Sequence, residues 1–419
     1  MKEHFDLGVD LKERVRRRLL DERDQALFDG SPVERRLWLR EAVRRALEEE
    51  RVVLPGAQVA ALVREISDEV VGLGPIEALL RNPRITEVMI NGPEEVYVER
   101  DGRIRRADVT LESDGQILHL IERVIGPLGL RVDESQPFVE ARLPDGSRLH
   151  AIIRPLSVNG PVVTIRKFAV VPFTLDDLIA NGTMTARVAD FLDAAVSAKL
   201  NLIVSGGTGS GKTTLLNVLS GSVPVDERLI TIEDAAELRL AREHVVSLEA
   251  RPANIEGEGE VTVRDLVRNA LRMRPDRIIV GEVRGGEALD MLQAMNTGHE
   301  GSLSTCHANS PEDLLVRLET MVMMAELGLP AGPVRQQIAA ALDLIVHTAR
   351  LTDGSRKVVR VTEVGGLDEQ GLILSDVYRF VRTGTAADGR VRGKFETPGV
   401  PRLLERIKAA GIDLEWERE

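Results

Sequence analysis

"NLIVSGGTGSGKTTLLNVLS", residues 201–220, joins an apolar run, a glycine-rich loop and a segment with helical spacing. Residues 206–214 fit the pattern G-x-x-x-x-G-K-[ST]. Such a loop turns backbone N–H groups toward phosphate oxygens, and the helix amino terminus adds positive potential. We expect Lys212 to reach the β and γ phosphates of ATP and the Thr213 hydroxyl to ligate Mg²⁺. The predicted nucleotide-binding residues are Gly206, Gly207, Thr208, Gly209, Ser210, Gly211, Lys212, Thr213 and Thr214.

After residue 201, apolar runs alternate with helical segments. The runs are "NLIVSGG", "RLITIED", "RIIVGEV", "GSLSTCHA" and "LDLIVHTARL". Alternation of this kind is typical of a parallel sheet covered by helices on both sides. We therefore expect an α/β domain over residues 175–419, preceded by a linker at 169–174 in which Thr174 caps the next helix.

The chain before the linker has a different pattern. Dense charge and helical spacing over residues 11 to about 50 predict a small helical module, 1–54, and a further helix is expected over 58–71. The arginines at 14, 16, 17 and 18 form either a solvated face or a docking face for an acidic or membrane-proximal partner. Short alternating stretches with turns at Asn91-Gly92 and Asp101-Gly102, and a helix over 115–125, predict an α+β domain over 55–168.

Composition limits the classes of function. The net charge of −12 and the aromatic content of 3% argue against sequence-independent nucleic-acid binding over a whole face, although a local basic groove remains possible. The single cysteine, Cys306, excludes an internal disulfide and a multi-cysteine zinc site. We find neither a signal peptide nor an apolar run of about 20 residues, so we expect a cytoplasmic protein.

Carboxylates follow two of the predicted strands. Glu233 and Asp234 end "RLITIED", where they either cap a helix or take part in catalysis beside the phosphate loop. In "RIIVGEVRGG", residues 277–286, a glycine stands where many ATP-hydrolysing chains carry an aspartate, and Glu282 follows it. Glu282 is expected at the same sheet edge as Lys212, where its longer side chain can contact the attacking water, or the metal through water. Either glutamate remains a candidate for the catalytic base.

Two histidines flank the strand in "TGHEGSLSTCHANS", residues 297–310. His299 and His307 are candidates to contact the γ-phosphate and to relay its presence to neighbouring elements. A metal pair is the weaker alternative, because no third ligand with suitable spacing is evident.

The order of the phosphate loop, "TIEDAAEL", "RIIVGEVRGGEA" and "TGHEGSLSTCHANS" resembles that of the type II/type IV secretion and pilus-assembly traffic ATPases. In that superfamily these segments are the Walker A motif, Asp box, atypical Walker B motif and His box. The region from about residue 55 to 350 is most similar to the CpaF subgroup, which serves tight-adherence (Flp) pili. The resemblance implies a RecA-like P-loop ATPase domain that works with ATP and Mg²⁺.

The resemblance also implies partners. Members of the superfamily form homohexameric rings, in which arginines from the amino-terminal domain reach a nucleotide. By position the candidates are Arg154 and Arg166, with Arg148 a weaker third, unless these are ordinary strand-surface arginines. The implied function is an ATPase motor that drives pilus assembly or protein secretion through an inner-membrane platform protein, peripherally associated with that membrane.

Four alternatives remain open. Retraction motors and type IV DNA/protein-secretion ATPases also lack the four-cysteine zinc module that this chain cannot form. A RecA-like nucleic-acid translocase shares the sheet and the phosphate loop, although the charge and aromatic content make nucleic acid an unlikely partner. A nucleotide-gated scaffold with negligible turnover is disfavoured by the presence of Glu233 and Glu282.

Overall fold

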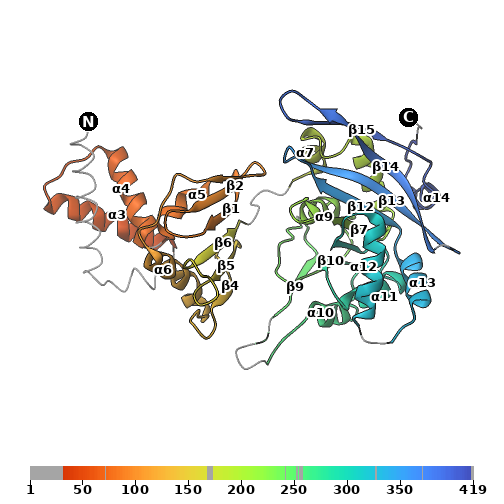
Figure 1. Ribbon diagram of the computed structural model, residues 1–419, viewed down its shortest axis with the longest axis horizontal. Helices are drawn as coiled ribbons and strands as arrows, with labels where there is room; N and C mark the ends of the chain where they lie inside the picture. Colours follow the sequence, from red (N-terminus) through yellow and green to blue (C-terminus); the bar gives the residue numbers. More distant parts are fainter. Residues whose placement is uncertain are drawn as a thin grey trace. The chain divides into compact units, whose positions relative to one another are not determined.

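The computed structural model describes residues 32–70, 72–167, 173–240, 242–251, 253, 258–325, 328–369 and 371–416 (Figure 1). The chain divides into two compact units, Met1–Val170 and Val171–Glu419. The arginines at 14, 16, 17 and 18, the last residue of the expected α+β domain, 168, and residues 169–172 of the expected linker lie outside the described residues. No helix within the described ranges has the length and apolar run needed to cross a membrane.

The first unit begins with a helical pair. Helices α3 (Pro32–Glu49) and α4 (Gly56–Val70) pack through Leu39, Val43 and Ile66, which are fully buried. The helical spacing before residue 50 therefore predicted α3 correctly, and the bounds expected for α4 differ by two residues or fewer. The short helices η1 (Gly74–Ile76) and α5 (Glu77–Arg81) lead into the sheet.

The rest of the first unit is a six-stranded antiparallel sheet in the order β3-β2-β1-β6-β5-β4. Its strands are β1 (Ile85–Ile90), β2 (Val96–Arg100), β3 (Arg103–Arg106), β4 (Phe138–Arg142), β5 (Arg148–Ile152) and β6 (Val162–Arg166). Asp101 and Gly102 join β2 to β3 with φ of 53° and 73°, the left-handed values that a two-residue hairpin turn requires. Helix α6 (Asp114–Ile125), followed by η2 (Gly126–Leu128), buries Ile117 and Ile121 in the core of this unit.

The second unit is built on a nine-stranded sheet in the order β15-β14-β13-β12-β7-β11-β10-β8-β9. The predicted parallel arrangement is confirmed for six neighbouring strands: β7 (Leu202–Gly206), β8 (Leu229–Glu233), β9 (Val245–Glu249), β10 (Arg277–Val283), β11 (Leu303–His307) and β12 (Leu344–Arg350). Three antiparallel strands extend it: β13 (Arg356–Asp368), β14 (Gly371–Thr385) and β15 (Val391–Glu396). The sequence did not predict this extension.

Helices cover both faces of the parallel part, as expected. One face packs against α7 (Leu175–Ala180), α8 (Ala186–Ser197), α9 (Lys212–Ser220) and α14 (Leu404–Ala409). The other packs against α10 (Val263–Ala270), α11 (Glu287–Asn296), α12 (Pro311–Met323) and α13 (Ala331–Ala341). Figure 1 shows α11, α12 and α13 side by side. Thr174 caps α7 as predicted, in a reciprocal box with Asp177.

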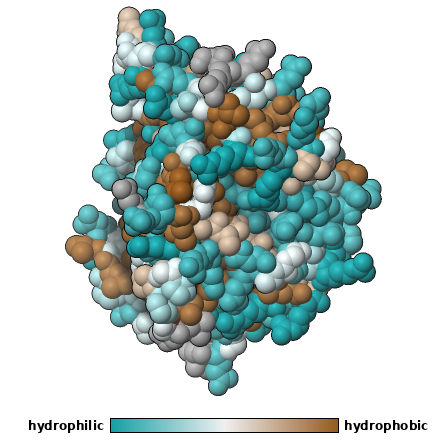
Figure 2. Space-filling view, turned by 90° about the vertical axis from the view of Figure 1, so that its right-hand side faces the viewer, coloured by the Kyte–Doolittle hydropathy of each residue, from teal (hydrophilic) through white to brown (hydrophobic). Residues whose placement is uncertain are grey.

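Figure 2 shows the face of the molecule at the right-hand side of Figure 1. Hydrophilic residues cover most of this face, and hydrophobic residues lie among them in small separate groups. Contacts made through this face would therefore be largely polar.

Candidate active site

The phosphate loop runs from the end of β7 to the start of α9 and takes a conformation that only glycine adopts freely. Gly206, Gly209 and Gly211 have φ of 153°, 70° and 96°. A Cβ on Gly206 would lie 2.3 Å from the carbonyl oxygen of Thr348, so no side chain fits there. Gly211 is the N-cap of α9 and has no side chain to occupy the N–H groups of the first turn. These groups are therefore available to an anion.

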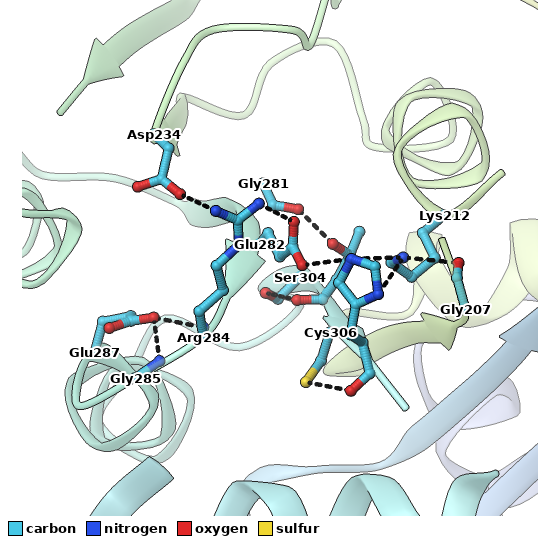
Figure 3. A network of polar contacts seen from close by, with 12 residues as sticks. Gly207, Lys212, Asp234, Gly281, Glu282, Arg284, Gly285, Glu287, Ser304 and Cys306 are labelled. Atoms are coloured by element: carbon cyan, nitrogen blue, oxygen red, sulfur yellow. Dashed lines mark hydrogen bonds and ion pairs between the residues drawn. The ribbon is translucent and has the colours of Figure 1, made fainter. Parts of the chain in front are cut away.

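Lys212 folds back over the loop. Its side chain is largely buried, and Nζ donates to the Gly207 carbonyl oxygen at 3.1 Å (Figure 3). Nζ also lies 3.3 Å from Nε2 and 3.4 Å from Nδ1 of His307, at the end of the neighbouring strand β11. Thr213 follows in the first turn of α9, half-buried. The loop fits a nucleotide phosphate chain held by Lys212, with the Thr213 hydroxyl available to Mg²⁺.

Glu282 lies beyond His307 on strand β10. Its Oε1 is 2.9 Å from Nε2 of His307, and its Oε2 accepts from Nη2 of Arg284 at 2.8 Å. Arg284 in turn donates through Nη1 to Asp234 at 3.0 Å (Figure 3). Because β7, β11, β10 and β8 are neighbours in the sheet, four strand ends bring these groups to one edge. Polar contacts thus run from Lys212 through His307 and Glu282 to Asp234.

The charge state of His307 follows from its surroundings. Burial lowers the pKa of His307 below its ordinary value of 6.5, and the neighbouring Lys212 ammonium lowers it further. Nε2 of His307 is 2.9 Å from Oε1 of Glu282, although this oxygen has no hydrogen-bond partner among the described residues, and Nζ of Lys212 lies 3.3 and 3.4 Å from the two ring nitrogens. His307 therefore lies in close contact with both the phosphate-binding lysine and the carboxylate.

Glu233 has a different environment. It is 4% exposed, and its carboxylate accepts from the backbone N–H groups of Glu237 and Leu238 at 2.9 to 3.2 Å. A Cβ at position 281 would lie 2.6 Å from Cγ of Glu233, so the residue before Glu282 must be glycine. The carboxylate thus holds the loop after β8 much as a helix cap would, although the described residues between β8 and β9 contain no helix.

The structure does not bring His299 to this edge. His299 precedes β11, while His307 ends it, and the five residues of the strand span about 16 Å at about 3.3 Å each. Ser302 Oγ donates to the His299 carbonyl oxygen at 2.8 Å, at the amino end of the strand. The expectation that His299 contacts the γ-phosphate is not met, because strand direction places it at the opposite edge of the sheet.

The candidate arginines lie in the first unit. Arg166 ends β6 and pairs through Nε with Oε1 of Glu87 at 3.0 Å; directly across from it on β5 is Arg148. Arg154 is exposed and follows the other end of β5, where Ile152 pairs with Val162. Arg148 and Arg166 therefore share one end of the β5–β6 pair, and Arg154 lies near the other.

Several residues beside the loop were not predicted. Thr348 Oγ1 lies 2.9 Å from Ser210 Oγ, and Nδ1 of the buried His347 lies 2.9 Å from Ser205 Oγ. Arg356 donates through Nε to the Gly209 carbonyl oxygen at 2.9 Å. All come from the β12–β13 hairpin, for which "LDLIVHTARLTDGSRKV", a strand followed by an Asp-Gly turn, was the available signal.

Known proteins resemble this chain in sequence and in fold. A Mycobacterium tuberculosis protein named for conjugal transfer is 39% identical over 315 residues, which cover 74% of this chain and 89% of that protein. The type IV secretion system protein VirB11 of Brucella suis is 34% identical over 302 residues, covering 66% and 84%. The X-ray structure of the Yersinia pseudotuberculosis ATPase DotB has the same fold, with a TM-score of 0.51 and 16% identity over 67% of this chain and 76% of that one. The model of the family described as type II/IV secretion system protein matches residues 69–392, and the chain belongs to this family of secretion ATPases.

Proposed function

We propose that the chain hydrolyses ATP with Mg²⁺ and works as a homohexameric, CpaF-like motor in pilus assembly or in protein secretion across the inner membrane. The observation that carries this proposal is the line of contacts from Lys212 through His307 to Glu282 beside a glycine cradle. A cation for the phosphates and a group that orients the attacking water are parts that phosphoryl transfer to water uses, and Lys212 and Glu282 can supply them.

Each group has a role in this proposal. Lys212 neutralises the β and γ phosphates, and Glu282 orients or deprotonates the attacking water. His307 contacts the γ-phosphate and relays its presence to Glu282. Glu233 remains the second candidate for the base, but its carboxylate is engaged by two backbone N–H groups, which favours Glu282.

The proposed assembly supplies what one subunit lacks. Arg154 and Arg166 of the amino-terminal unit would reach the nucleotide of a neighbouring subunit, where positive charge stabilises the departing phosphate. The ring would lie in the cytoplasm and bind the inner membrane peripherally, through a platform protein.

The names of the relatives support a second candidate, a type IV secretion ATPase that exports DNA or protein. A RecA-like nucleic-acid translocase is less favoured, because the net charge is −12. The phosphate-release rate separates these functions. Stimulation by the membrane platform protein supports the motor, and stimulation by single-stranded DNA alone supports a translocase.

The hydrolase is tested with Glu282→Gln in the purified full chain. We expect nucleotide affinity close to wild type and turnover lower by about 100-fold or more, since the amide cannot accept a proton from water. Lys212→Ala should lose turnover together with phosphate binding. Glu405→Gln, the same change at an exposed position of α14, is the matched control and should behave as wild type. Wild-type turnover in Glu282→Gln would exclude this carboxylate as the base.

A further inference from the structure

The β12–β13 hairpin lies directly against the phosphate loop. Strand β12 pairs in parallel with β7, so that Thr348 is opposite Gly206, the first residue of the loop. Thr348 Oγ1 donates to the Ser205 carbonyl oxygen at 3.1 Å and lies 2.9 Å from Ser210 Oγ. The hairpin is therefore attached to the loop at two points, Ser205 before its first glycine and Ser210 before its last.

Two arginines of this hairpin are close to the loop. Arg350 and Arg356 are directly opposite each other across β12 and β13. Arg356 donates to the Gly209 carbonyl oxygen, and its Cδ lies 3.4 Å from where a Cβ on Gly211 would be. Nη1 of Arg350 lies 3.6 Å from the corresponding point on Gly209. Both cationic side chains thus adjoin the backbone that turns around the phosphates.

The arginines and the proposed catalytic groups lie on opposite sides of the loop. Strand β7 stands between β12, which carries Arg350, and β11, which carries His307. A triphosphate with its γ-phosphate toward His307 and Glu282 would present to the hairpin the part that ATP shares with ADP. Like charges opposite each other in a sheet repel, and an anion beside them relieves that repulsion.

We propose that Arg350 and Arg356 form a binding subsite for the ADP portion of the nucleotide, supplied by the same subunit as the phosphate loop. Arg350, the exposed one of the pair, contacts the phosphates. Arg356 is a positioning residue that holds the Gly209 carbonyl so that the loop N–H groups face inward. The inference rests on the proposed nucleotide function. The subsite adds one prediction to that function: the two arginines bind the nucleotide in the ground state, so they lower KM without raising kcat.

The test measures affinity for fluorescently labelled ADP and ATP, together with steady-state phosphate release. Arg350→Ala should weaken both nucleotides by the same factor, about tenfold or more for a lost charge-assisted contact. KM should rise by a similar factor, while kcat at saturation stays near wild type. Arg350→Lys should recover part of the affinity.

For Arg356, glutamine and alanine separate the positioning role from charge. Arg356→Gln keeps an N–H donor for the Gly209 carbonyl and should bind ADP better than Arg356→Ala. Arg382→Ala, the same change at an exposed position of β14, is the matched control and should bind as wild type.

Unchanged ADP affinity in a folded Arg350→Ala protein would overturn the subsite, as would a loss confined to ATP or to kcat. Equal affinities in the two Arg356 variants would overturn the positioning role. A wild-type chain that binds neither nucleotide would instead overturn the proposed function.

Discussion

At the scale of single residues, His307 lies between opposite charges. Lys212 approaches the ring from the phosphate loop, and Glu282 contacts it from β10. Protonation would favour Glu282 but would also place a second positive charge beside Lys212. Burial adds to that penalty, so the neutral ring prevails near neutral pH.

We therefore predict that the turnover of the proposed hydrolase falls on the acid side of pH 6.5, with a midpoint below that value. Protonated His307 can no longer accept from Lys212, and both protonated ring nitrogens become donors. The measurement is kcat/KM against pH, in which His307→Gln should lack this acid limb. His119→Gln, at an exposed histidine of α6, should keep it.

The same shift affects folding stability. Because the pKa of His307 is lower in the folded chain than in the unfolded one, the unfolded chain binds more protons between the two values. The contribution of His307 to stability is complete above pH 6.5 and is lost as the pH falls through the folded-state pKa.

For the kinetic prediction, an acid limb of kcat/KM that survives in His307→Gln would assign the effect on turnover to another group.

At the scale of elements, the residue that fits at the end of one strand is determined by the side chains of the neighbouring strands. Gly281 has no side chain because Glu233 of the neighbouring strand β8 occupies that space. The Gly281 carbonyl oxygen also accepts from Thr305 Oγ1 of β11, at 2.6 Å. The glycine before Glu282 thus fits three strands together at the edge where the site lies.

We predict that Gly281→Ala destabilises the fold by about 1–3 kcal/mol, the usual cost of overpacking a core. The new methyl group should push Glu233 away from the N–H groups of Glu237 and Leu238, and turnover should fall with the loss of that loop. Thermal unfolding and phosphate release measure the two effects. Gly332→Ala adds the same methyl group to α13, where nothing lies within 4 Å, and should leave both unchanged. Equal melting temperatures of Gly281→Ala and Gly332→Ala would contradict the requirement for glycine beside Glu233.

Strand direction also explains what the sequence predicted. Apolar runs identified β7, β8, β10, β11 and β12, because buried parallel strands are apolar on both faces. The long antiparallel strand β14 is only partly buried, so it has no such run. Glu282 and His307 lie at the carboxyl ends of their strands, Lys212 follows one, and the three meet at one edge, whereas His299 precedes a strand. Contacts such as Ser205 to His347 join positions 142 residues apart and depend on strand order, which spacing in the sequence does not reveal.

At the scale of the whole molecule, the first unit carries arginine on one side of its sheet. Glu87, Arg166, Arg148 and Arg142 are opposite one another on β1, β6, β5 and β4, so they share a face. The other face is buried against α6. Arg166 remains about half exposed despite its pairing with Glu87. A sheet face with exposed arginine suits contact with an anion or an acidic surface.

The position of the arginines makes the proposed ring testable one residue at a time. Four residues at about 3.4 Å each separate the two ends of the β5–β6 pair, so Arg154 and Arg166 are at ends about 14 Å apart. We predict that Arg154→Ala and Arg166→Ala each lower turnover by about 1,000-fold or more, the effect expected of an arginine supplied from a neighbouring subunit. The measurement is phosphate release by each variant alone, after thermal unfolding has shown that the variant is folded.

Mixing then separates an arginine that acts across subunits from one that acts within its own. In a mixed ring with Lys212→Ala, a site with an intact lysine can lie beside a subunit with an intact arginine. Random mixing of equal amounts makes about a quarter of the sites complete in a closed ring of identical subunits, so turnover should recover to about that fraction of wild type.

Lys212→Ala mixed with Glu282→Gln is the control. Lys212 and Glu282 are joined through His307 within one unit, so no mixed site regains both groups and no recovery is expected. If the arginine variants recover no more than this control in rings shown to be mixed, the arginines act within their own subunit or support the fold. Recovery with only one of them would identify the end of the β5–β6 pair that faces the neighbouring nucleotide.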